Sequence, residues 1–245
     1  MNTQTTIEKM KQMRLSGMSD LYHQSLQKNL YADYTTDQFL ALLVDTEWEH
    51  RQNRKIQNLV NKARFKLSAS AVDIDYTSRR NLDKNTFERL LSLGFIRESE
   101  NIIITGASGV GKSYLAQAIG HAACHQSIKT YYTSSARLTE DVQLAKIEGT
   151  YIKLLKKIRK MNLLIIDDFG LHSINDNYRQ ALMDILEDRY DRASTIITSQ
   201  IPVSAWHEMI GEGTMADAIL DRLVYSSHRI ELKGESMRKN KQLKG

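Results

Sequence analysis

A loop whose residues could cradle phosphates lies near the middle of the chain. Residues 106–113 read Gly-Ala-Ser-Gly-Val-Gly-Lys-Ser and match the pattern G-x-x-x-x-G-K-[ST] at every fixed position. Glycine lets the backbone adopt positive φ and approach a ligand closely, so that successive N–H groups converge on phosphate oxygens. The apolar run 102–105 before the loop and the helical pattern after it are the context that this motif requires.

The motif assigns a role to each of its side chains. Lys112 is expected to reach the β- and γ-phosphates of a nucleotide, which the motif alone leaves open as ATP or GTP, and the Ser113 hydroxyl is expected to bind Mg²⁺. The alternative is a glycine-rich turn that contains a lysine by chance, which the complete match in this context disfavours. Besides Lys112, the predicted nucleotide-binding residues are Gly106, Ala107, Ser108, Gly109, Val110, Gly111, Ser113 and Tyr114.

Two carboxylates follow a second apolar run, 163–166, which is typical of a buried parallel strand. Asp167 is predicted to hold Mg²⁺, partly through water, because hard cations prefer oxygen ligands. Asp168 is predicted to orient or polarise the attacking water. Many ATPases have Glu at this second position, so the shorter Asp predicts slow or assembly-dependent hydrolysis. The alternative is a strand that simply ends in solvated acids.

A fourth strand pattern ends in the polar run Thr198-Ser199-Gln200. If this strand lies between the other two, its end points at the γ-phosphate. Gln200, with Ser199 as second choice, is therefore predicted to contact the γ-phosphate or the attacking water. An ordinary polar exit from a strand before Pro202 explains these residues nearly as well.

Arg222 lies in a helical pattern just before the last strand pattern. An exposed arginine at this position could reach the nucleotide of a neighbouring subunit and stabilise the charge that develops in phosphoryl transfer. The alternative is a surface arginine paired with Asp221 or Asp217.

Strand and helix patterns alternate from about residue 101, which predicts an α/β domain with a parallel sheet covered on both faces. Residues 1–68 read as helices and form a predicted small all-helical domain. Residues 69–100 are a predicted connector, and residues 101–245 are a predicted ATPase domain with a short basic tail.

Four cations of the longest N-terminal helical pattern fall on one helix face: Arg51, Arg54, Lys55 and Lys62. One interpretation is a surface that binds the phosphate backbone of DNA. The other is the solvated face of an amphipathic helix, which local pairing with Glu47 or Glu49 would support. The sequence favours neither.

The composition agrees with a folded chain and is a weak argument for an acidic partner. The chain has 245 residues, 41% of them hydrophobic, and a net charge of +5. Cys124 is the only cysteine, so an internal disulfide is excluded, as is common in a reducing compartment. The N-terminus has no signal-peptide pattern, and no apolar run reaches the ~20 residues of a membrane span. We therefore expect a cytoplasmic chain that does not enter a membrane.

These motifs together resemble AAA+ ATPases of the DnaC/DnaA initiator clade and, within it, the IstB-type helper ATPases of transposition. Three features are the most specific: Leu-x-Gly-Met at 15–18, Glu-x-x-x-Arg at 47–51, and Lys-Gly-Glu-Ser-Met-Arg at 233–238. The resemblance implies a five-stranded parallel sheet of order 5-1-4-3-2. The sequence stops soon after the last strand pattern, so we expect the C-terminal lid domain of such proteins to be reduced or absent. The resemblance also implies ATP at a subunit interface, with Arg222 acting in trans, and leaves Arg238 as a substitute second sensor.

The resemblance further implies an ATPase that forms a homo-oligomer on duplex DNA, helps to select the target site and stimulates a partner transposase. Because such an interface is heterologous, the oligomer is expected to be a ring or a helix. Two alternatives remain open: a DnaC-like loader of a replicative helicase, and a nucleotide-switched DNA scaffold with little hydrolysis.

Overall fold

The computed structural model describes residues 2–28, 30–76, 80–211 and 213–237, and for residues 30 and 31 only the backbone. The chain divides into two compact units, residues 1–58 and 59–245. The division falls inside a helix rather than at residue 68, and the predicted connector, 69–100, belongs to the second unit. The two units are described separately.

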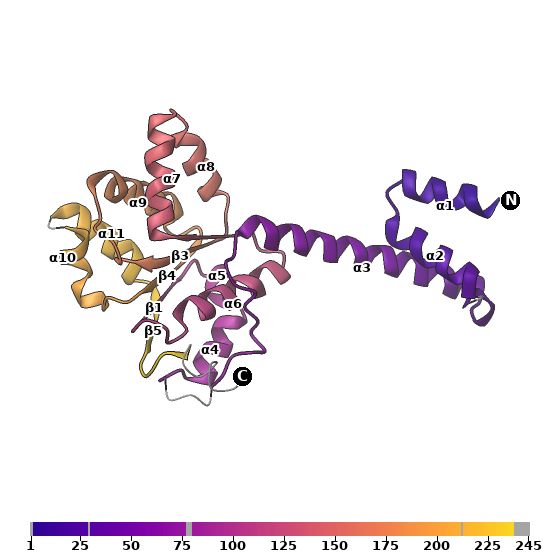
Figure 1. Cartoon of the computed structure of the whole chain (residues 1–245), viewed down its shortest axis with the longest axis horizontal. Helices are drawn as coiled ribbons and strands as arrows, with labels where there is room; N and C mark the ends of the chain where they lie inside the picture. Colours follow the sequence, from indigo (N-terminus) through magenta and orange to yellow (C-terminus); the bar gives the residue numbers. More distant parts are fainter. Residues whose placement is uncertain (1, 29, 77–79, 212, 238–245) are drawn as a thin grey trace. The chain divides into compact units, whose positions relative to one another are not determined.

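The first unit consists of helices. They are α1 (Thr3–Gln12), α2 (Ser16–Lys28), the 3-10 turn η1 (Leu30–Asp33) and the first part of α3 (Thr36–Ala63) (Figure 1). The Asn2 side chain caps α1 by accepting the N–H of Gln4. Among the described residues of this unit, Ile7 and Leu43 are the buried apolar side chains. Because its apolar core is small, polar contacts contribute much of what holds this unit together.

A buried carboxylate joins α2 to α3. Glu47 Oε2 accepts the N–H of Gly17 at 2.8 Å and of Met18 at 3.3 Å, so it caps the first turn of α2. Its Oε1 accepts Arg51 Nε at 2.7 Å, and Arg51 also donates to the carbonyl of Arg14. The two N-terminal motifs of the sequence are therefore in direct contact with each other.

Gly17, the second residue of α2, lies against the backbone of α3. A Cβ at this position would lie 2.9 Å from the carbonyl oxygen of Thr46. Only glycine therefore leaves room for the Glu47 cap. Burial raises the pKa of the Glu47 carboxyl, but the bonds from Arg51, Met18 and Gly17 outweigh it, so that the pKa lies below its ordinary value.

The second unit is built on a five-stranded sheet in which every pair of neighbours is parallel. The order is β2-β3-β4-β1-β5, which is the predicted order 5-1-4-3-2 read from the other edge and confirms it. The strands are β1 (Asn101–Gly106), β2 (Thr130–Ser134), β3 (Leu163–Phe169), β4 (Ser194–Ser199) and β5 (Ser227–Leu232).

Helices cover both faces of this sheet because successive strand residues point to opposite sides. Ile102 and Ile104 of β1 belong to one apolar cluster and Ile103 to the other. The first cluster includes residues of α4 (Lys84–Leu91), α5 (Gly94–Arg97) and α6 (Lys112–His125). The other layer contains α7 (Ser135–Ile147), α8 (Tyr151–Arg159), α9 (Asp176–Arg189), the 3-10 turn η2 (Val203–Ala205), α10 (Trp206–Ile210) and α11 (Thr214–Val224) (Figure 1).

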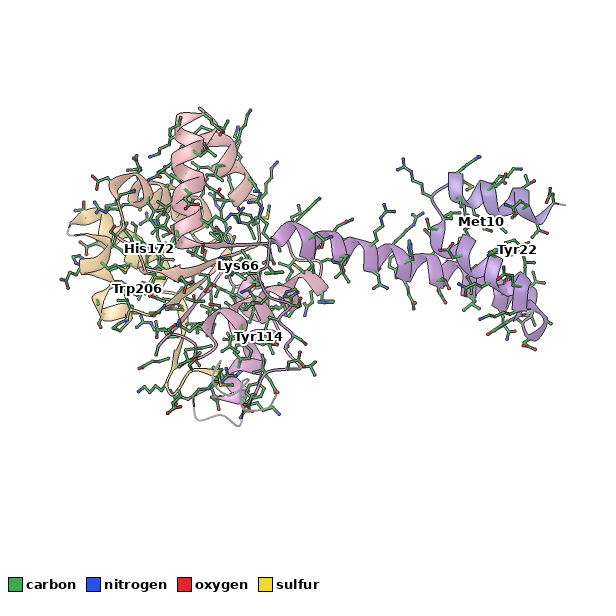
Figure 2. The ribbon with its side chains drawn as sticks, in the orientation of Figure 1. Met10, Tyr22, Lys66, Tyr114, His172 and Trp206 are labelled. Atoms are coloured by element: carbon green, nitrogen blue, oxygen red, sulfur yellow. The ribbon has the colours of Figure 1, made fainter. Side chains whose placement is uncertain are left out.

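Side chains at the centre of each layer are closely packed. Trp206, labelled in Figure 2, is fully buried, and its ring lies edge-on to that of Phe169 at 5.0 Å between centroids. On the other face, Gln117 of α6 accepts the N–H groups of Lys66 and Leu67 and donates to the carbonyl of Ser113. The segment that follows α3 is thereby attached to the helix that begins at the glycine-rich loop.

The sequence pattern predicted the long helix after the phosphate loop but missed the shortest helices. The helix predicted at 112–125 is α6. The short helices α5 and α10 were not predicted, because four or five residues do not establish a period. The described residues end at Met237, so the predicted lid reduction and the proposed role of Arg238 lie outside them. No helix in the described part of the chain is long and apolar enough to cross a membrane.

The Glu47 contacts predict an acid-sensitive first unit. A lowered folded pKa means that Glu47 stabilises this unit above its unfolded pKa of about 4.3, and that the stabilisation is lost as pH falls through the folded pKa. In the full chain, amide protection of α2, corrected for intrinsic exchange rates, should fall as the pH is lowered from the unfolded pKa through the folded pKa of Glu47. The Glu47→Gln variant should lack this step and be less protected at neutral pH, whereas the exposed control Glu49→Gln should resemble the wild type. Equal protection in all three proteins would contradict this account.

Candidate nucleotide-binding site

The predicted phosphate loop and the predicted metal ligands meet at the carboxyl ends of the central strands. The loop connects the carboxyl end of β1 to the first turn of α6. β4 lies between β1 and β3, so the ends of these three strands are neighbours. The crevice beyond the carboxyl ends of parallel strands is where such sheets bind ligands.

Asp167 is the centre of the hydrogen bonds at these strand ends. Its side chain is nearly buried, with 3% exposed, and it accepts hydrogen bonds from three hydroxyl groups. Ser113 Oγ donates to Oδ1 at 2.8 Å, Thr198 Oγ1 donates to the same oxygen, and Tyr132 donates to Oδ2 at 2.6 Å. The carboxylate therefore joins α6, β2 and β4 at the end of β3.

Lys112 is also buried at these strand ends. Its ammonium donates to the carbonyl of Ala107 at 2.8 Å, across the loop of the motif. This contact places the charge beside the backbone that the motif assigns to phosphates. The hydroxyl of Tyr114, which is labelled in Figure 2, instead contacts the backbone of Ser70. The nucleotide role of Tyr114 stays a prediction.

The second carboxylate stands on an irregular piece of strand. Asp168 has φ +56°, and the pairing of β3 with β4 is interrupted by a bulge between Ile166 and Phe169. Its N–H donates to Thr198 Oγ1 at 3.0 Å. Positive φ is uncommon in residues other than glycine but is several-fold enriched in Asp and occurs at functional sites. The bulge turns Asp168 away from the regular pleat.

Two residues at this site were not predicted from the sequence. Thr198 contacts both carboxylate positions, through the Asp167 side chain and the Asp168 N–H. Tyr132 of β2 lies on the same face as Asp167 because Ser134 is paired with Asp167 and Tyr132 is two residues earlier. Burial, followed by the hydrogen bond to Asp167, raises the pKa of the Tyr132 phenol, which therefore remains a donor.

The predicted γ-phosphate sensor has a mixed outcome in the structure. Ser199 is buried, and its hydroxyl donates to the carbonyl of Phe169 and accepts the N–H of Ile201, so the fold uses it. Gln200 is exposed and directly follows β4. Its position agrees with the expected strand order, and its role stays a prediction.

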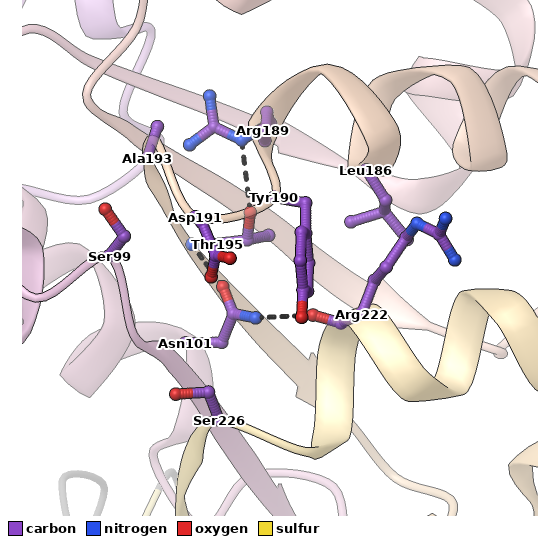
Figure 3. Close-up of a pocket in the computed structure, with 10 residues that line it drawn as sticks. All are labelled: Ser99, Asn101, Leu186, Arg189, Tyr190, Asp191, Ala193, Thr195, Arg222 and Ser226. Carbon is purple, nitrogen blue, oxygen red and sulfur yellow. Dashed lines mark hydrogen bonds between the residues drawn. The ribbon is translucent and has the colours of Figure 1, made fainter.

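Arg222 lies near the amino ends of β1 and β4, opposite to the end of the strands that carries the phosphate loop. A pocket there is lined by residues that include Asn101 at the start of β1, Thr195 near the start of β4, and Arg222 (Figure 3). Arg222 Nε donates to Glu187 at 2.6 Å, and its guanidinium lies over the Tyr190 ring at 5.9 Å from the centroid. The partner is thus Glu187 of α9 rather than Asp221 or Asp217. Arg222 does not lie beside the phosphate loop of its own chain.

The four predicted DNA-binding residues lie along α3 and are exposed. Arg51 belongs to the Glu47 contacts, as the solvated-face interpretation anticipated for this one residue. Arg54, Lys55 and Lys62 form no salt bridge with any described residue. Contact of these three residues with DNA stays a prediction.

The donor set suits a hard cation held with few protein ligands. Among the described residues, no group of three or more His, Cys, Asp and Glu side chains could enclose a metal ion. Mg²⁺ usually keeps several waters and is bound through one or two carboxylates together with substrate phosphates. One carboxylate, Asp167, beside the Ser113 hydroxyl fits that pattern.

Comparisons of the sequence find relatives over nearly its whole length. The family model of the IstB-like ATP binding protein matches residues 8–245. The insertion-sequence ATP-binding protein y4pL of Sinorhizobium fredii is 43% identical over 98% of this chain and 98% of its own length. The ATP-binding protein of insertion sequence IS1162 from Pseudomonas fluorescens is 34% identical over 83% of this chain and 89% of its own length.

Comparisons of the structure find similar folds among replication proteins. The DnaC helicase loader superposes with a TM-score of 0.54 and 23% identity, over 61% of this chain and 87% of that protein. AMPPCP-bound DnaA from Aquifex aeolicus superposes with a TM-score of 0.59 and 17% identity, over 74% of this chain and 56% of that protein. At these identities the likeness concerns the fold alone.

If Asp167 holds Mg²⁺, as the sequence predicts, loss of the Tyr132 hydroxyl is expected to weaken metal binding. In Tyr132→Phe, Asp167 loses one of its hydroxyl donors and is less firmly oriented, so the Mg²⁺ concentration for half-maximal ATP binding should rise about tenfold, equivalent to ~1.4 kcal/mol. Titration of Mg²⁺ at fixed ATP measures this. The matched control is Tyr131→Phe, because Tyr131 is equally buried and its hydroxyl contacts Arg64 instead. Identical titrations for the two variants would contradict the assignment.

Proposed function

Because the chain belongs to the family of IstB-like ATP-binding proteins and has the AAA+ fold, we propose that it is an ATPase that assembles on duplex DNA and assists a partner transposase. ATP binding and a place in insertion sequences are the common description of its relatives. Hydrolysis, DNA binding, target selection and the transposase are the further steps of the proposal. The observation that carries it is that the Asp167 site lies at the carboxyl ends of the strands and Arg222 near their amino ends.

Support for hydrolysis comes from the arrangement around Asp167. Lys112 and Ser113 begin α6, and Asp167 is one hydrogen bond from Ser113. In this proposal Lys112 holds the β- and γ-phosphates, Ser113 and Asp167 hold Mg²⁺, and Asp168 orients the attacking water. Mg²⁺ would neutralise the charge on the transferred phosphoryl group. Gln200 is the proposed contact to the γ-phosphate from β4.

Support for assembly comes from the position of Arg222. Arg222 lies away from the phosphate loop of its own chain, so in this proposal the nucleotide that it contacts belongs to another subunit. The two surfaces that meet are then different, so the contact is heterologous and repeats into a ring or a helix. ATP in such an interface would be bound by Lys112, Ser113 and Asp167 of one subunit and by Arg222 of the next. The Glu187–Arg222 pair would open when the interface forms.

Support for DNA binding comes from the exposed cations of α3 and the net charge of +5. Arg54, Lys55 and Lys62 are the proposed contacts to phosphates. Such contacts give affinity with little sequence preference and a strong dependence on salt. We assign Arg51 to the structure of the first unit, because it is held by Glu47 and by the Arg14 carbonyl.

The alternative function is a loader of a replicative helicase. The fold is shared with the DnaC helicase loader, but at 23% identity this resemblance does not identify a partner. The relatives y4pL and the IS1162 protein, which match 98% and 83% of this chain, are named for insertion sequences. A transposase is therefore the better-supported partner.

Mixing two inactive variants tests the trans contact. Lys112→Ala should bind ATP poorly, and Arg222→Ala should bind ATP but hydrolyse it slowly. A mixture should recover part of the wild-type ATPase rate, because some interfaces combine an intact Lys112 with an intact Arg222. Arg192→Ala is the control, since Arg192 is exposed and lies in the loop between α9 and β4. A wild-type rate for Arg222→Ala, or no recovery on mixing, would refute the trans assignment.

Charge reversal on α3 tests DNA binding. The double variant Arg54→Glu, Lys55→Glu should bind duplex DNA at least tenfold more weakly and lower the slope of log affinity against log salt by about 0.9 for each lost phosphate contact. ATP affinity should not change. The control Lys9→Glu, Lys11→Glu alters the net charge equally on the exposed face of α1. If both double variants weaken DNA binding equally, the effect is one of net charge and α3 is not the contact surface.

A further inference from the structure

A buried arginine outside the known motifs contacts the phosphate loop. Arg80, in the segment before α4, has only 5% of its surface exposed. Its Nη1 donates to the carbonyl of Val110 at 3.3 Å, and its Nη2 donates to the carbonyl of Asp75 at 2.7 Å. Its Nε is buried and has no hydrogen-bond partner among the described residues.

This arrangement costs free energy of folding. Burial lowers the pKa of the Arg80 guanidinium, against the attraction of Asp75, because a charge loses hydration inside the protein. A buried donor without a partner adds to this cost, because the Nε–H has lost its hydration and gained no hydrogen bond to a described residue in return. An apolar side chain would fill the same space at less cost, so the guanidinium calls for an explanation beyond packing.

The peptide that Arg80 contacts explains what the guanidinium does. The carbonyl of Val110 and the N–H of Gly111 belong to one planar trans peptide, and they point in opposite directions. A donor that holds the Val110 carbonyl from outside therefore directs the Gly111 N–H to the other side of the loop. That side is where the motif gathers N–H groups around phosphates. The positive charge also polarises the peptide and makes its N–H a stronger donor.

The preceding peptide is held in the same way by the C-terminal segment. The N–H of Met237 donates to the carbonyl of Gly109 at 2.9 Å, which directs the Val110 N–H inward. The two holding groups are connected, because the N–H of Lys233 donates to the carbonyl of Arg80 at 3.0 Å. Two consecutive peptides of the phosphate loop are thus held at their carbonyls. One is held by Arg80, which precedes the first strand in the sequence, and the other by Met237, which follows the last strand.

The glycines of the loop are needed for these contacts as well as for positive φ. A Cβ on Gly111 would lie 2.6 Å from Arg80 Nη1, and a Cβ on Gly109 would overlap the Ser236 side chain. Their φ angles are +103° and +82°. The loop is therefore shaped to receive Arg80 and Ser236 on its outer side.

We propose that Arg80 is a positioning residue for the nucleotide: it orients the Val110–Gly111 peptide so that the loop meets phosphates without first reorganising. Preorganisation of this kind raises affinity by removing a cost that binding would otherwise carry. The effect concerns the phosphates and not the base. The inference needs only ATP binding and is independent of the proposed hydrolysis, DNA and transposase steps.

The test compares Arg80→Gln and Arg80→Lys with the same substitutions at Arg89, an exposed arginine of α4. Calorimetry without DNA measures the affinity for Mg-ATP and Mg-ADP, and competition measures that for inorganic tripolyphosphate. Arg80→Gln should weaken ATP and tripolyphosphate by the same factor, about tenfold or more. Arg80→Lys keeps the charge but cannot bridge two carbonyls in the fork geometry of a guanidinium, so it should lose less. The Arg89 variants should match the wild type.

Circular dichroism and thermal unfolding without nucleotide identify a variant that fails to fold. If Arg80→Gln fails, the comparison rests on Arg80→Lys, for which an intermediate loss of tripolyphosphate affinity is expected. Wild-type affinity for tripolyphosphate in a folded Arg80 variant would overturn the proposal. So would a loss confined to ATP, because that would place Arg80 at the base or ribose.

Discussion

The Asp167 carboxylate is the constraint on which the second unit depends. It accepts hydrogen bonds from hydroxyls of α6, β2 and β4, so one buried charge determines how three elements meet at the end of β3. A buried carboxylate is tolerable only when its oxygens are satisfied, and here they are satisfied by residues of the site itself. Stability and the chemistry of the site therefore draw on the same side chains.

Local patterns were sufficient for the strands, the longer helices and the contiguous motifs, whereas the strand order was implied by the family resemblance. Apolar periodicity located α6 and the five strands, and 106–113 and 167–168 are each a single run of residues. Thr198, Tyr132 and Arg80 could not be found in this way. Each is an ordinary residue in its own segment and matters only through the strand register or a loop packed against another loop. The Arg222 partner, Glu187, is 35 residues away in the chain for the same reason.

The first unit shows how a polar contact can replace a core. Three hydrogen bonds join Glu47 to Arg51 and to the first turn of α2, and a fourth joins Arg51 to the Arg14 carbonyl, whereas few apolar side chains are buried nearby. From the sequence alone, Arg51 could belong equally well to a DNA-binding surface or to the solvated face of a helix. Its contacts with Glu47 and the Arg14 carbonyl agree with the local pairing that the solvated-face interpretation anticipated for this one residue.

The hydrogen bond from the Met237 N–H to the Gly109 carbonyl connects the phosphate loop directly to residues 233–237. A molecule that binds residues 233–237 and draws Met237 away would release one loop peptide and change the affinity for ATP. Thermodynamic linkage requires the converse, so that ATP changes the affinity for that molecule by the same factor. Through this one backbone hydrogen bond, the nucleotide state could be communicated to a partner that never approaches the nucleotide.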